Sequence, residues 1–280
     1  MGIGLAVLTA GEVIMAKTVH LGGLSQLLNV WPGLVLLVVC LVYCIKRPLP
    51  KLIESCQLAI WAVVLSGTLS LLIQIAGRSP RPLVDHELAS IDAQGHFSTL
   101  FFVHLISQTP AVKKGLAIVY AVLPLLLIAS VIVPPILGRS YASRRFVVGI
   151  ILAAILTAAS SALWPAIGPW TTQDFSPTKE QAGVDAYLTR LRSNAPVDLD
   201  ESNAGIVSFP SFHVVLAVLS AVALGSCRRL RVWVWGVAGL TCISTITTGW
   251  HYGIDVLGGL VLSIIAIAVT NRMPGDCSQT

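Results

Sequence analysis

Seven apolar segments alternate with polar connections along the chain, and each is close to the length that crosses a bilayer as a helix, about 20 residues. The segments are residues 28–45, 58–76, 115–137, 146–168, 210–226, 231–249 and 252–270. Two shorter apolar stretches, 1–16 and 97–108, could each be a short span, a re-entrant piece or an interfacial helix. The pattern predicts an all-α fold in the form of a polytopic transmembrane helix bundle.

The composition agrees with a membrane protein and excludes an ordinary soluble domain. Of the 280 residues, 55% are hydrophobic and only 11% are charged, whereas soluble domains carry about 25% charged residues. The net charge of +5 does not indicate a nucleic-acid partner, because the basic residues lie in short connections, where they orient helices. The six cysteines include no Cys-x-x-Cys pair, so the sequence predicts neither a disulfide framework nor a zinc site.

The distribution of basic residues predicts how the helices are oriented, because short cytoplasmic connections are enriched in Lys and Arg. Ten basic residues fall in four short segments: Lys46, Arg47 and Lys51; Arg139, Arg144 and Arg145; Arg228, Arg229 and Arg231; and Arg272. We therefore expect these segments in the cytoplasm and the long segments 77–114 and 169–209 outside. The helix start at residue 210 and the break near residue 250 then share the outer face.

One pair of ionisable residues at this outer face has the spacing of a catalytic dyad. His251 and Asp255 are four residues apart, so they share one face of a helix. A carboxylate beside an imidazole fixes its tautomer and raises its basicity. Ionisable groups inside a span are costly and indicate function. The alternative is an interfacial histidine with an aspartate that stabilises the helix start.

A second group of polar residues lies where the 210–226 segment begins. Pro210, with serines around it, marks the start of a helix. A helix N-terminus together with the hydroxyl of Ser211 suits a phosphate, and His213 in the first turn could donate a proton. The alternative is simple capping by a serine. Two histidines and one aspartate on one face favour phosphoryl transfer through a histidine nucleophile.

These two groups resemble the motifs of the type 2 phosphatidic acid phosphatase superfamily, Pro-Ser-Gly-His followed by Ser-Arg-x5-His-x3-Asp. The corresponding residues here are Pro210-Ser211-Phe212-His213 and Ser244-Thr245-x5-His251-x3-Asp255. The phosphate-binding arginine of the second motif is missing. The exchange of Gly for Phe and the missing arginine are similar to the inositol phosphorylceramide synthase branch. The segments Trp164-Pro165-Ala166-Ile167-Gly168-Pro169-Trp170 and Gly205-Ile206-Val207 are similar to that branch as well.

The resemblance implies a six-helix phosphatase-like core, here with extra N-terminal helices, no metal or other cofactor, and a phosphohistidine intermediate. It implies that His251 is the nucleophile, that Asp255 orients it and that His213 is the general acid. We expect N-terminal membrane helices and an outer loop over residues 1–114 and the catalytic core over residues 115–280. The substrate would be a membrane lipid phosphate, and the acceptor would be water for a phosphatase or a lipid or polyol hydroxyl for a transferase.

Groups that bind the phosphate are predicted mainly in the long outer loop. Residues 178–192 have the pattern of an amphipathic helix, and a polar loop of this size is typical of a lid or a substrate-binding element. A guanidinium group binds phosphate through two hydrogen bonds. We predict substrate contacts from Arg192, Arg190, Lys179, Ser211, Ser244 and Thr245.

A further pair, Gln74 and Arg81, imitates the superfamily's Lys-x6-Arg-Pro motif. Two spanning segments separate this pair from His213, whereas the family has none there. The alternative is a solvated outer turn rich in proline.

Two other functions stay open from the sequence. His251 and Asp255 could form the proton relay of a transporter, although transporters carry broken segments near the midplane and the polar groups here lie at helix ends. The same residues with His213 could bind the metal of a membrane hydrolase, although the chain has no His-Glu-x-x-His motif. We expect an integral protein of a bacterial inner membrane with its active site on the periplasmic face. The sequence makes no prediction of the oligomeric state.

Overall fold

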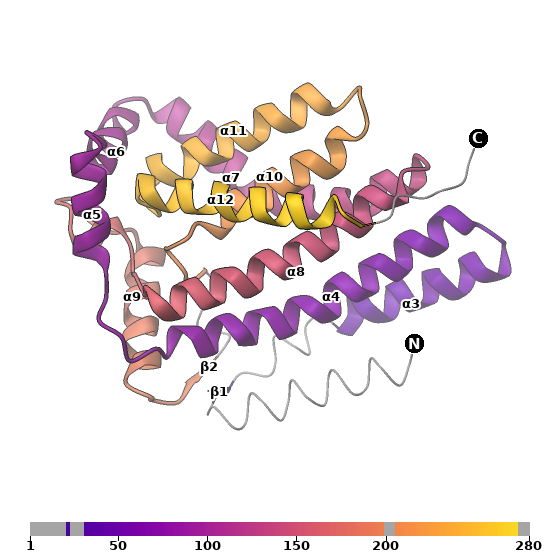
Figure 1. Cartoon of the computed structure of the whole chain (residues 1–280), viewed down its shortest axis with the longest axis horizontal. Helices are drawn as coiled ribbons and strands as arrows, with labels where there is room; N and C mark the ends of the chain where they lie inside the picture. The colour runs from indigo at the N-terminus through magenta and orange to yellow at the C-terminus, as the bar shows by residue number, and fades with distance from the viewer. Residues whose placement is uncertain (1–20, 23–30, 199–204, 274–280) are drawn as a thin grey trace.

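The computed structural model describes residues 21–22, 31–198 and 205–273, which form a bundle of long helices (Figure 1). All seven predicted spans are helical. They are α3 (Trp31–Lys46), α4 (Pro50–Gly77), α7 (Pro110–Ile136), α8 (Ser140–Leu163), α10 (Phe212–Gly225), α11 (Arg231–Thr247) and α12 (Gly253–Thr270). The strands in the described residues are β1 (Leu21–Gly22) and β2 (Val197–Asp198), which pair in parallel. The prediction of an all-α helix bundle is confirmed, and the stretch 1–16 lies outside the described residues.

Four of these helices, α4, α7, α8 and α12, are long and apolar enough to cross a membrane. The chain is an integral membrane protein. In contrast, α10 has 14 residues and is about 21 Å long at 1.5 Å per residue, which is less than the roughly 30 Å of a hydrocarbon core. The irregular segment 205–211 before α10 therefore lies where the bundle itself must satisfy the polar groups of the backbone.

The centre of the bundle is α10, which packs against α7, α8, α11 and α12. Val214 and Val215 in its first turns are fully buried. Outside this group, α4 packs against α7 and α8, and α3 packs on α4. The helix α4 thus connects the N-terminal part of the chain to the helices after residue 114, and the division of the chain at that residue stays a prediction.

The basic connections between the helices gather at one end of the bundle, at the right of Figure 1. Arg144 forms an ion pair with Glu54 at 2.6 Å. Arg145 donates a hydrogen bond to the side chain of Asn271 at 3.3 Å, and Arg139 donates one to the carbonyl group of Ser226. These arginines connect the ends of several helices. The residues that the charge pattern assigns to one face of the membrane therefore do lie together at one end of the bundle.

The opposite end, at the left of Figure 1, carries the shorter helices α5 (Asp85–Gln94), α6 (Thr99–Ser107), η1 (Pro169–Thr171) and α9 (Lys179–Arg192). With nine residues, α6 is too short to span a bilayer, so the apolar stretch 97–108 is not a crossing. The amphipathic helix predicted at 178–192 is α9. It begins with a capping box between Thr178 and Gln181.

Gly259 of α12 lies close against the start of α10, and it gives a test of the packing. A Cβ atom there would lie 2.5 Å from the carbonyl oxygen of Ser211 and 2.9 Å from Cβ of Val214. Gly259→Ala must therefore push the two helices apart, and we expect a loss of about 1–3 kcal/mol in the free energy of unfolding. The midpoint of thermal unfolding in detergent should fall accordingly.

Gly239→Ala in α11 is the matched control, because nothing lies within 4 Å of its added Cβ. Alanine is also the better helix former by about 1 kcal/mol, so this midpoint should not fall. Equal midpoints for the two variants would contradict the close packing of α10 on α12.

Candidate active site

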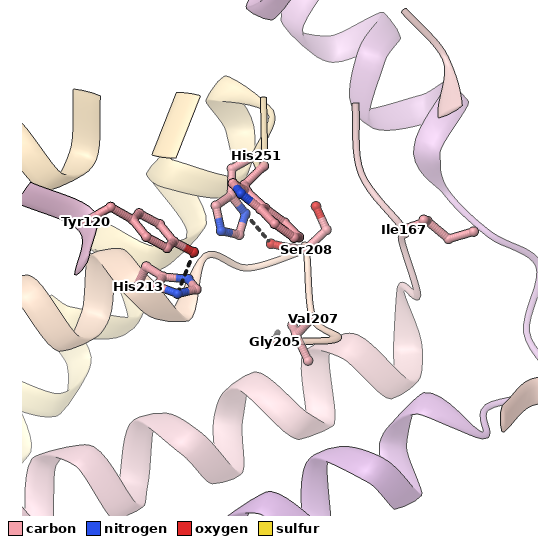
Figure 2. A pocket seen from close by; sticks show the side chains of 8 residues that line it. Tyr120, Ile167, Gly205, Val207, Ser208, His213 and His251 are labelled. Atoms are coloured by element: carbon pink, nitrogen blue, oxygen red, sulfur yellow. Dashed lines mark hydrogen bonds between the residues drawn. The ribbon is translucent and has the colours of Figure 1, made fainter. Parts of the chain in front are cut away.

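A cavity of about 180 Å³ lies at the end of the bundle opposite the basic connections, between the segment that leads into α10 and the turn that leads into α12 (Figure 2). It is lined by Tyr120, Ile167, Gly205, Val207, Ser208, His213, Trp250 and His251. Both predicted catalytic histidines therefore face the same cavity. Their ring centroids are 5.7 Å apart, and their planes are inclined by 59°.

Asp255 joins the two chain segments that carry these histidines. Its Oδ2 accepts a hydrogen bond from the hydroxyl of Ser208 at 2.8 Å and one from the backbone N–H of Tyr252 at 2.9 Å. The main-chain carbonyl of Asp255 accepts a third from the N–H of Ser211 at 3.0 Å. The side chain of Asp255 is fully buried. The aspartate thus fixes the start of α10 against the start of α12.

The hydrogen bonds of His251 define which ring nitrogen carries the hydrogen. Its Nδ1 lies 3.0 Å from the carbonyl oxygen of Ser208 and 3.4 Å from Oδ2 of Asp255. A carbonyl oxygen can only accept, so the hydrogen is on Nδ1 and the lone pair is on Nε2. Burial lowers the pKa of His251 to about 4, so the ring is neutral near pH 7. Nε2 is therefore available as a nucleophile.

Tyr120 of α7 is a cavity residue that the sequence patterns did not predict. Its hydroxyl lies 2.6 Å from Nε2 of His213, and the two rings stack with centroids 4.6 Å apart (Figure 2). The two residues are 93 positions apart in the sequence. The one available signal was a phenol inside an apolar run, and this signal does not identify the partner of the hydroxyl.

Asp92 of α5 holds the backbone next to His251. Its carboxylate accepts hydrogen bonds from the backbone N–H groups of Gly253 and Ile254, at 2.7 and 2.8 Å. These amides begin α12, so Asp92 caps that helix from another part of the chain. Burial raises the pKa of Asp92, while these two hydrogen bonds lower it.

Asp85, at the other end of α5, holds the opposite wall of the cavity. It accepts hydrogen bonds from the N–H groups of Ile167 and Gly168, at 3.0 and 2.8 Å. It also accepts one from the hydroxyl of Tyr252 at 3.3 Å. Ile167 itself lines the cavity. The short helix α5 therefore positions two separate segments of the cavity wall.

Three hydroxyl residues predicted to contact substrate are not among those that line the cavity. Ser211 is the N-cap of α10, but its buried hydroxyl has no hydrogen-bond partner among the described residues. Ser244 donates to the carbonyl of Leu116 at 2.9 Å, and Thr245 donates to its own helix, at the carbonyl of Cys242. Ser208 is the serine on the wall, because the irregular backbone before α10 places it beside Asp255.

The predicted cations belong to α9 and do not line the cavity. Arg192 donates to the carbonyl of Arg81, Arg190 donates to the carbonyl of Pro196 at 3.0 Å, and Lys179 is exposed. No Lys or Arg is among the described residues that line the cavity. The described residues also include no group of three His, Cys, Asp or Glu side chains arranged to hold a metal ion.

The pair that imitates the superfamily's Lys-x6-Arg-Pro motif connects α4 to α9. Gln74 is buried and accepts a hydrogen bond from the hydroxyl of Tyr187 at 3.0 Å. Arg81 is exposed, and its carbonyl receives the hydrogen bond of Arg192. The structure therefore brings together His213, His251 and Asp255, and it leaves this pair outside the cavity wall.

The comparison with known families assigns this helix bundle and its paired histidines to a superfamily. The model of the PAP2 superfamily matches residues 86–269, more than half of the chain, so the chain belongs to the PAP2 superfamily. Members of this superfamily are phosphatases. The match includes all the residues that line the cavity, together with Asp92 and Asp255, and begins one residue after Asp85. No curated protein and no solved structure matches the chain.

The family match confirms the predicted superfamily. It does not distinguish the inositol phosphorylceramide synthase-like branch, which stays a prediction.

Removal of the Asp92 carboxylate should loosen the start of α12. Asp92→Ala leaves the amides of Gly253 and Ile254 without their acceptor, and loss of a capping side chain costs about 0.5–2 kcal/mol. We expect a lower midpoint of thermal unfolding, and a smaller decrease for Asp92→Asn, which keeps one acceptor oxygen. Glu87→Ala, at an exposed carboxylate of the same helix, is the control. If Asp92→Ala were as stable as Glu87→Ala, the capping role would be wrong.

Proposed function

We propose that the chain is a lipid-phosphate phosphatase or phosphotransferase that works without a metal, through a phosphohistidine at His251. One observation carries the proposal. The rings of His251 and His213 line one cavity, with centroids 5.7 Å apart. This separation allows a single phosphoryl group to contact both rings. Membership of a phosphatase superfamily supports the same chemistry.

In the first step, the lone pair of Nε2 of His251 attacks phosphorus, and the bond from phosphorus to the leaving oxygen breaks. His213 is the source of the proton that the leaving oxygen takes up. An anionic phosphoryl group between the rings favours the protonated form of His213, since a nearby opposite charge stabilises an imidazolium. In the second step, water or another hydroxyl attacks the phosphohistidine, its proton returns to His213, and His251 is regenerated.

The carboxylate of Asp255 and the carbonyl of Ser208 keep His251 reactive. Both accept from the Nδ1 edge, so they stabilise the positive charge that the ring gains as Nε2 attacks. The carbonyl is the closer of the two, and Asp255 also holds the segment that carries this carbonyl, through the hydroxyl of Ser208.

A lipid substrate is supported by the depth and the lining of the cavity. The short α10 leaves the irregular segment before it inside the bundle, because 14 residues of helix do not cross a hydrocarbon core. Ile167, Val207 and Trp250 give the cavity an apolar wall. A phosphate that reaches this depth is best carried by a molecule whose chains stay in the bilayer. The basic connections are at the opposite end, so the cavity faces the outer side, which in a bacterial inner membrane is the periplasm.

We place the chain in the inositol phosphorylceramide synthase-like branch because of Phe212 and of Thr245, which stands where the superfamily has arginine. A hydroxyl compound would then compete with water as the acceptor. We propose that Arg192, with Arg190 and Lys179 of the same helix α9, contacts the bound substrate. Support comes from Nη1 of Arg192, which is buried without a hydrogen-bond partner among the described residues.

The phosphohistidine can be tested by trapping. With a lipid substrate labelled at phosphorus and an alkaline quench, wild-type protein should retain label, and His251→Ala should retain none. Asp255→Asn should slow turnover roughly 10²–10⁴-fold, by analogy with the orienting carboxylate of other histidine catalysts. Asp174→Asn, at an exposed carboxylate of the outer loop, is the control and should be unchanged. Label that persists in His251→Ala would exclude this residue as the nucleophile.

The pKa of His251 predicts the acid limb of the pH–rate profile. Attack requires neutral Nε2, and burial lowers the pKa of this ring to about 4. With a 4-nitrophenyl phosphodiester, whose charge is constant and whose leaving group needs no proton, the rate of phosphoenzyme formation should stay level from pH 7 toward pH 5. It should then decline as the pH falls through about 4. A decline centred near the ordinary histidine pKa of about 6.5 would mean that the nucleophile is not a buried ring.

A further inference from the structure

The hydrogen bond between Tyr120 and His213 bears directly on how a proton reaches the leaving group. The phenolic oxygen lies 2.6 Å from Nε2 of His213, a short distance for such a pair. The stacked rings hold this geometry, with centroids 4.6 Å apart and planes inclined by 29°. Tyr120 lines the same cavity as His251, and Figure 2 shows its hydroxyl between the two histidine side chains.

We propose that Tyr120 is a catalytic residue whose hydroxyl delivers the proton of His213 to the leaving oxygen. The proposal rests on the proposed function, because it assigns the proton path of that reaction. A nitrogen carries one hydrogen at most. Nε2 of His213 is already engaged by the phenol, so a proton on this nitrogen points at Tyr120 and not into open space. A hydroxyl donates and accepts at once, so it can pass the proton onward.

Every proton that moves is accounted for in the two half-reactions. In the first, the N–H of the His213 imidazolium passes to the oxygen of Tyr120 while the phenolic O–H passes to the leaving oxygen. The phosphorus–oxygen bond breaks as the bond from phosphorus to Nε2 of His251 forms. In the second, the acceptor hydroxyl gives its proton to Tyr120, which returns one to His213, and the acceptor–phosphorus bond replaces the phosphorus–nitrogen bond. Tyr120 is a neutral phenol before and after each step.

The position of Tyr120 also suits a residue that donates a proton to a leaving alkoxide. The ring of Tyr120 in α7 stacks on the ring of His213 in α10, so the donor is fixed before substrate binds, and preorganised donors are more effective than mobile ones. The described cavity wall offers one other hydroxyl, that of Ser208, and this one donates to Asp255 at 2.8 Å. Tyr120 is therefore the hydroxyl on this wall that is coupled to a histidine.

The test uses Tyr120→Phe with two esters of the same phosphate, one with an alkyl leaving group and one with 4-nitrophenol. Alkoxide needs a proton to leave and nitrophenolate does not. We expect turnover of the alkyl ester to fall roughly 10²–10⁴-fold, the usual contribution of general acid catalysis. Turnover of the nitrophenyl ester should fall less than about tenfold, and label on His251 should still form from it. Tyr43→Phe, at an exposed tyrosine of α3, is the control and should affect neither ester.

His213→Ala and the double variant complete the experiment. If the proton passes through both residues in series, the double variant should be no slower on the alkyl ester than the slower single variant. Equal losses on both esters in Tyr120→Phe, or no loss on the alkyl ester, would overturn the role of Tyr120 while leaving the phosphohistidine intact. Absence of label from both esters in wild-type protein would instead overturn the proposed function, and the role of Tyr120 with it. Should Tyr120→Phe unfold at a lower temperature, a fluorinated tyrosine at this position, which keeps the ring and the hydroxyl, should restore turnover of the alkyl ester.

Discussion

The buried carboxylate of Asp255 is the interaction on which the arrangement of the cavity depends. A carboxylate in an apolar bundle must find hydrogen-bond donors, and here the donors come from both chain segments that carry a histidine. The hydroxyl of Ser208 and the N–H of Tyr252 converge on one oxygen, while Ser211 donates to the main chain of the same residue. Because these contacts join the starts of α10 and α12, the hydrogen bonds of one buried residue also determine where the two imidazoles face each other.

The short helix α5, at the end of the bundle that holds the cavity, reinforces this connection. The carboxylates of Asp85 and Asp92 lie at opposite ends of that ten-residue helix, and each accepts two backbone N–H groups from a different segment. A helix outside the spans therefore acts as a brace for two stretches of irregular backbone. Such stretches are tolerated at membrane depth only when protein groups satisfy them. The hydroxyl of Tyr252 donates a hydrogen bond to Asp85. Tyr252 directly precedes the two amides that Asp92 binds, so this bond connects the contacts of the two aspartates.

The sequence predicted the structural features that depend on residues close together in the chain. The seven long helices follow from runs of apolar residues, and the amphipathic pattern of residues 178–192 identified α9. His251 does lie near Asp255, at 3.4 Å, but it precedes the first residue of α12, so the two side chains meet at the start of that helix and do not share one of its faces as the i, i+4 spacing predicted. Contacts between distant segments could not be predicted in this way. Nothing in the composition of α5 distinguishes capping carboxylates from solvated ones, and the pairing of Tyr120 with His213 depends on how α7 packs on α10. Ser208 rather than Ser211 reaches the cavity because of the irregular backbone between them, which no periodic pattern describes.

The most direct test of the central claim is an experimental structure of the protein with bound vanadate, an analogue of the transferring phosphoryl group. The account predicts vanadium at bonding distance from Nε2 of His251, with His213 and Tyr120 on the side of the leaving oxygen. Vanadate bound away from His251, or histidine rings that face different cavities, would contradict it.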